Sequence, residues 1–154
     1  MIHKIFLAIA ILVSSLDSSA QIAYPYQDIK LEKPSDFSET EPLALSAANY
    51  ILTTPFVEVD KNRSGALQFL SNWMTGNKDF TFHKNGLILD ISSDKNVLSI
   101  FVAAMAKYSL ENKKEAQNPL LVEQNASQIT LAYCDDPANN FKLRKKQRKL
   151  LEKN

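Results

Sequence analysis

The residues best placed to do chemistry form a basic block near the C-terminus of this 154-residue chain. Within the run FKLRKKQRKLLEKN, the cations are Lys142, Arg144, Lys145, Lys146, Arg148 and Lys149. On a helix, Leu143 and Leu150 would dock on the rest of the protein while the cations spread over the remaining surface. Three uses are open: a solvated terminal helix, contact with an anionic surface such as a membrane or an envelope polymer, and binding of a partner protein.

Charge is divided unevenly along the sequence. Residues 21–141 carry 10 Lys/Arg and 15 Asp/Glu, whereas residues 142–154 carry seven Lys/Arg and one Glu. A basic tail that merely balances a mildly acidic body is the simplest alternative to binding. The acidic body and the export signal described below disfavour nucleic acid as the partner.

Few residues are available for catalysis. Beyond residue 20 the sequence holds one histidine, His83, and one cysteine, Cys134. A serine–histidine–aspartate arrangement would have to use His83, and no serine lies in a nucleophile-elbow pattern. Cys134 has no partner for an intramolecular disulfide, and we expect a small buried hydrophobe rather than a nucleophile paired with His83. We therefore predict no catalytic residue.

Cofactor and metal sites are not expected either. Zinc sites need clustered His and Cys side chains, and the glycines Gly65, Gly76 and Gly86 are too scattered for a phosphate-binding loop. The stretch from Asp60 to Gly65 resembles the first half of a calcium loop, but Ser71 stands where such a loop has a bidentate Glu. A helix cap at Asp60 is the simpler interpretation.

Four aromatic side chains lie close together in the sequence: Phe69, Trp73, Phe80 and Phe82. They could line a binding pocket. Aromatic residues at helical spacing are more often part of a core, however, and we expect these to be core residues.

The elements that must position these residues are predicted to be helices. Apolar spacing and capping residues indicate helices over residues 42–52, 63–75, 96–112, 119–134 and 141–153. The third is apolar on every side from Val97 to Ala106, so we expect the other helices to surround it. Gly76 is placed to end the second helix in the left-handed conformation. Asn118 and Pro119 are typical of a helix start.

The segment from Asp79 to Asp90 is harder to assign. Phe80 and Phe82 alternate with polar residues, and Asn85-Gly86 is typical of a tight turn between strands. A short β-hairpin and an ordered loop are both open here. The predicted fold is all-α: a compact bundle of four to five helices around a central buried helix, with the hairpin as an option.

The first 20 residues have the pattern of a secretory signal peptide. Lys4 precedes an apolar run over residues 5–13, and small residues precede an expected cut after Ala20. The apolar run is too short to span a bilayer, and we see no transmembrane span in the mature chain. We expect an exported protein, periplasmic or secreted, with an extended lead-in over residues 21–41 and a single domain over residues 42–154.

Three stretches resemble small uncharacterised exported helical proteins of Bacteroidetes-type bacteria: the leader end Ser-Ser-Ala-Gln, AMAKYSLENKK and NNFKLRKKQRK. The resemblance implies an envelope address and a helical fold, and no known activity. The predicted function is a non-catalytic secreted or periplasmic module that binds a partner protein or an envelope component. The alternatives are an exported inhibitor or immunity-type protein and, less favoured, a cofactor-free enzyme.

Overall fold

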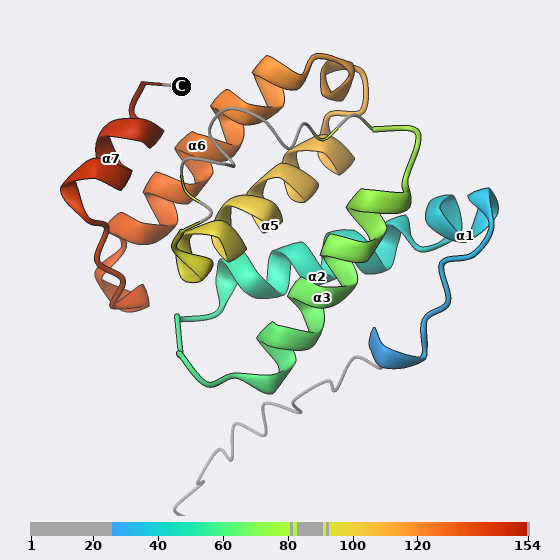
Figure 1. Cartoon of the computed structure of the whole chain (residues 1–154), viewed down its shortest axis with the longest axis horizontal. Coiled ribbons are helices and arrows are strands. Elements are labelled where there is room, and N and C mark those ends of the chain that lie inside the picture. Colours follow the sequence, from blue (N-terminus) through green and yellow to red (C-terminus); the bar gives the residue numbers. More distant parts are fainter. Residues whose placement is uncertain (1–25, 81, 83–90, 92, 154) are drawn as a thin grey trace, which may run out of the picture.

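The computed structural model describes residues 26–80, 82, 91 and 93–153; the other residues are not described (Figure 1). Its α-helices are α1 (Pro34–Glu39), α2 (Glu41–Thr53), α3 (Lys61–Gly76), α5 (Lys95–Glu111), α6 (Pro119–Asp135) and α7 (Lys145–Leu151). Short 3-10 helices occur at η1 (Tyr26–Asp28), η2 (Glu115–Gln117) and η3 (Pro137–Asn139). No strand occurs in these ranges. The prediction of an all-helical fold is confirmed, and the optional hairpin falls mostly on residues outside this description.

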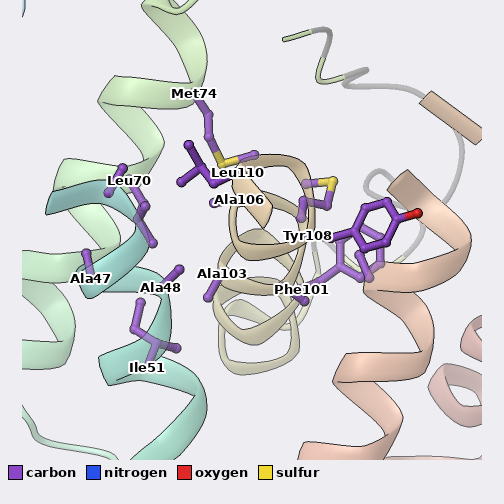
Figure 2. Close-up of a cluster of buried hydrophobic side chains, with 14 of the residues drawn as sticks. Ala47, Ala48, Ile51, Leu70, Met74, Phe101, Ala103, Ala106, Tyr108 and Leu110 are labelled. Carbon is purple, nitrogen blue, oxygen red and sulfur yellow. The ribbon is translucent and has the colours of Figure 1, made fainter. Parts of the chain in front are cut away.

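Helix α5 packs against α2, α3 and α6, and it buries side chains over most of its surface. Figure 2 shows Ala103 of α5 near Ala48 and Ile51 of α2, while Phe101 and Tyr108 lie toward α6. The small side chains of Ala48 and Ala103 let the axes of α2 and α5 approach closely. Because apolar surface leaves water on both sides of α5, the hydrophobic effect holds the surrounding helices together through it.

Three helices begin at side-chain caps, two of which, Asp60 and Asn118, the sequence indicated. Asp60, Asp94 and Asn118 accept hydrogen bonds from backbone N–H groups in the first turns of α3, α5 and α6. At α3, Asp60 Oδ1 lies 2.8 Å from the amide nitrogen of Asn62. Residues 61–65 are helical, so the stretch that resembles a calcium loop is the capped start of α3.

The lead-in and the end of α3 differ from expectation. The lead-in was expected to be extended, but its described part contains η1 and α1. Trp73 Nε1 donates to the carbonyl oxygen of Phe37 at 2.9 Å and thereby ties α1 to α3. The left-handed conformation expected at Gly76 is wrong, because α3 runs through this residue. Glycine leaves room there for the Phe37 ring, since a Cβ atom would lie 2.4 Å from Phe37 Cζ and would force that ring to move.

The last helix is shorter than the predicted 141–153. Asn140 has a φ of 47°, the left-handed conformation that Asn tolerates better than most residues. The chain turns there, passes through a non-helical segment and enters α7 at Lys145. The basic block is therefore split between an irregular segment and a two-turn helix.

Arg63 joins three parts of the chain from a buried position, with 5% of its surface exposed. Its Nη1 donates to the carbonyl of Ile51 at 3.0 Å, and its Nη2 donates to the carbonyl of Thr54 at 2.9 Å and to the hydroxyl of Tyr133 at 3.1 Å. The carbonyls lie at the C-terminal end of α2, the negative end of the helix dipole. The guanidinium also lies over the rings of Phe56 and Tyr133. Arg63 thus links α2, α3 and α6.

We predict that Arg63→Lys lowers the free energy of unfolding by about 2 kcal/mol, although the charge is kept. A lysine ammonium cannot bond the α2 carbonyls and the Tyr133 hydroxyl together as the forked guanidinium does. Urea denaturation followed by circular dichroism measures the change. Lys61→Arg, at an exposed position on the same helix, is the matched control and should be neutral. Equal midpoints for Arg63→Lys and wild type would contradict the assignment.

Candidate functional site

The basic block lies at one end of the molecule, on α7 and the segment before it (Figure 1). Helix α7 packs on α6, and its buried residues are Gln147 and Leu151. Leu143 and Leu150 are half-buried and pack against the core. The remaining positions of α7 face outward and carry most of the cations. Leu150 and the cations of α7 follow the helical pattern of the sequence, whereas Leu143 packs on the core from the non-helical segment before α7.

The two arginines of the block are engaged with the protein itself. Arg148 makes a two-pronged contact with the carboxylate of Asp135 at the end of α6, and its Nη1 lies 3.0 Å from Asp135 Oδ2. The hydrogen bonds from Arg148 lower the pKa of the Asp135 carboxyl. Arg144 Nη2 lies 3.4 Å from Oδ2 of Asp94. Arg144 and Arg148 therefore attach the C-terminal segment to the start of α5 and the end of α6.

The lysines are arranged differently. Four of them, Lys145, Lys146, Lys149 and Lys153, line an open hollow of about 480 Å³ together with Leu150. None of the four makes an ion pair with another residue that the structure describes. Lys142 is also exposed, but it precedes α7 and does not line the hollow. We call this feature the Leu150 hollow.

Asp94 fixes the position of α7 relative to α5. Its Oδ1 caps α5, while its Oδ2 accepts a hydrogen bond from Gln147 Nε2 at 2.8 Å and faces Arg144. Burial raises the pKa of the Asp94 carboxyl, but the hydrogen bond from Gln147, the backbone N–H groups of α5 and the charge of Arg144 outweigh it, and the pKa is lowered. The Asp94 carboxylate therefore caps the first turn of α5 and also links α7 to α5.

We predict that Asp94→Ala lowers the free energy of unfolding by about 1–2 kcal/mol and speeds amide hydrogen exchange in α7. Asp94→Asn keeps an oxygen for the cap and should affect α7 less. Because the pKa is lowered in the folded state, the stabilisation is present above the ordinary carboxyl range and is lost as pH falls through the lowered pKa. Hydrogen exchange with mass spectrometry at several pH values measures both effects. Unchanged α7 exchange in Asp94→Ala would show that α7 is held by other contacts.

The sequence-predicted aromatic residues are mostly core residues. Trp73 is fully buried, and Phe69 and Phe80 are 3% and 6% exposed. The Trp73 and Phe80 rings lie 5.8 Å apart, and the Phe80 and Phe82 rings 6.0 Å apart. Phe69 borders a hollow of about 300 Å³ beside η1 that Gln68 and Asn72 also line. Trp73, Phe80 and Phe82 thus form a series of ring contacts, whereas Phe69 stacks on Tyr26 with ring centroids 5.5 Å apart.

Cys134 is buried on α6. Burial, with a smaller effect from the negative charge of Asp135, raises the pKa of its thiol to about 12. A thiol in this state is protonated at neutral pH and is a poor nucleophile. His83 lies outside the described residues. No group of three or more His, Cys, Asp or Glu residues within the described ranges could hold a metal ion.

We predict that a thiol reagent such as dithiobis-nitrobenzoate labels native Cys134 only slowly at pH 8. The raised pKa keeps the sulfur protonated, and burial blocks access of the reagent. Labelling should become complete and fast in guanidinium chloride, which serves as the control. Rapid stoichiometric labelling of the native protein would contradict both the burial and the pKa.

The sequence indicated most of the residues at this end of the molecule. It did not indicate that Lys153 joins the lysines of the Leu150 hollow, or that Gln147 binds Asp94. Lys153 could have been found, because it lies four residues after Lys149 and seven after Lys146. The contact of Gln147 with Asp94 joins residues 53 apart in the sequence. No local pattern indicates such a pair.

Comparisons with known proteins give no match: no family model, no curated protein and no solved structure is similar to this chain. The similarity to exported Bacteroidetes-type proteins stays a prediction. Within the described ranges, no helix has the length and apolar character needed to cross a bilayer.

Proposed function

We propose that this protein is an exported, non-catalytic helical module that contacts an anionic membrane surface of the envelope through the exposed lysines on α7 and just after it. The observation that carries the proposal is that the arginines and the lysines of the basic block have different surroundings. The arginines pair with carboxylates of the protein, whereas Lys145, Lys146, Lys149 and Lys153 gather on one exposed surface. A tail that only neutralised an acidic body would pair its lysines as well.

The size of the expected attraction supports a peripheral contact. Each basic residue near an anionic membrane contributes about 1 kcal/mol, so four lysines supply about 4 kcal/mol. That is enough for reversible docking in the millimolar range and too little for permanent anchoring. The attachment of α7 to α5 and α6 also matters, because lysines on an ordered helix lose less entropy on binding than lysines on a free tail.

Charge separation along the chain sets the orientation. The body carries more carboxylates than cations, and the tail carries the reverse. An anionic surface would therefore attract the end of the molecule that bears α7 and repel the rest. Export through the predicted signal peptide, with cleavage after Ala20, is part of the same proposal and places the protein where such a surface is available.

We predict that the protein sediments with vesicles of phosphatidylglycerol and phosphatidylcholine at low salt and not near 1 M salt. The Debye length shortens from ~10 Å at 0.1 M to ~3 Å at 1 M, which screens the lysines. A variant with Lys145, Lys146, Lys149 and Lys153 changed to Gln should not sediment at either salt concentration. Its matched control changes four exposed lysines elsewhere: Lys30, Lys61, Lys78 and Lys114.

The control has the same net charge as the α7 variant, so it separates a local contact from overall charge. It should sediment as the wild type does. Equal sedimentation of the two variants would contradict the proposed site, and failure of the wild type to sediment at low salt would contradict the proposed function. Tighter binding of random-sequence duplex DNA than of vesicles at the same salt would assign the lysines to nucleic acid instead.

A further inference from the structure

The Leu150 hollow differs from a simple positive patch in what lies between its charges. Its accessible surface is largely hydrocarbon, from Leu150 and the lysine side chains around it. Long lysine side chains commonly lay their methylene groups along apolar surface and keep the ammonium group in water. The hollow therefore has an apolar floor and a cationic rim.

Helical spacing explains why these residues surround one hollow. Lys145 and Lys149 are one turn apart, and Lys146 is one turn before Leu150. Lys153, two residues beyond the end of α7, continues the series. Next to Leu150 the helix turns toward its buried side, where Gln147 and Leu151 lie. The cations therefore occupy one part of the helix surface, and Leu150 marks its boundary with the core.

This combination restricts the chemistry of a ligand. An inorganic anion would use the rim and leave the floor in contact with water. A wholly apolar ligand would use the floor and leave no partner for the ammonium groups. A phospholipid with net negative charge has both parts, because its phosphate is joined through glycerol to acyl chains. The hollow is open to solvent and lined by residues 145–153 alone, so it could contact a lipid at the level of its headgroup while the acyl chains stay in the bilayer.

We infer that the Leu150 hollow receives the headgroup of an anionic phospholipid, with the lysine ammonium groups around the phosphate and Leu150 against the glycerol and first acyl carbons. This inference rests on the proposed function and adds to it a defined ligand and a defined place. The lysines supply the attraction to the surface. Leu150 supplies the part of the contact that salt does not screen.

The test is a titration of the isotopically labelled full protein, followed by NMR of its amide and methyl groups. Three soluble probes are compared at constant ionic strength: short-chain phosphatidylglycerol below its micelle concentration, glycerol phosphate, and short-chain phosphatidylcholine. The first has negative charge and chains, the second charge alone, and the third chains with no net charge. We expect saturable shifts of the residue 145–153 amides and the Leu150 methyls with phosphatidylglycerol, at a concentration about tenfold lower than with either other probe.

Two variants separate the floor from the rim. Leu150→Gln keeps all the lysines and should weaken the binding of short-chain phosphatidylglycerol about fivefold while leaving glycerol phosphate unaffected. Leu150→Met keeps an apolar side chain and should bind as the wild type does. Hydrogen exchange of α7 shows whether Leu150→Gln opens the helix. If it does, the wild-type probe series and Leu150→Met decide the question.

Two results would overturn the inference. Equal midpoints for phosphatidylglycerol and glycerol phosphate would mean that the lysines bind phosphate without the lipid. Shifts that never saturate, or that extend equally to Lys30, Lys61 and Lys114, would mean that there is no defined site. Lysine-dependent vesicle sedimentation with either result would leave the proposed function in place, whereas loss of that sedimentation would contradict the function itself.

Discussion

The arrangement of the bundle depends on a buried cation whose partners are hydrogen-bond acceptors of the protein. Arg63 lies in the first turn of α3, and its guanidinium donates hydrogen bonds to the carbonyls at the end of α2 and to the hydroxyl of Tyr133 on α6. Burying a charge is costly unless hydrogen bonds replace its hydration. The guanidinium therefore requires α2 and α6 to lie where their acceptors can reach it, and those two helices flank α5. Hydrophobic burial around α5 favours compactness, and Arg63 adds directional contacts that set relative position.

A second polar arrangement continues from this bundle to the surface. The Asp94 carboxylate caps α5 and accepts a hydrogen bond from Gln147, and Arg148 pairs with Asp135. These contacts hold a two-turn helix that would be marginal by itself, since isolated helices of this length are unstable in water. Exposed pairs contribute little to stability one at a time. Their effect here is on position, because they set which side of α7 faces the solvent.

Position is what gives the basic block a function in our proposal. With the arginines directed at Asp94 and Asp135, the exposed side of α7 is left to lysines and to the edge of Leu150. The two kinds of cation suit the two tasks. The planar guanidinium forms paired hydrogen bonds with a fixed carboxylate, whereas the flexible ammonium group adapts to a mobile phosphate.

The sequence by itself determined the features that depend on neighbouring residues. Most helix positions follow from apolar spacing, the starts of α3 and α6 from Asp60 and Asn118, and the basic character of the tail from composition. The tertiary structure decided which cations are engaged, because Arg144 meets Asp94 from 50 residues away. It also made Gly76 a contact for Phe37 rather than a left-handed helix end. Such contacts join segments that only packing brings together, so neither residue of a pair indicates its partner in the sequence.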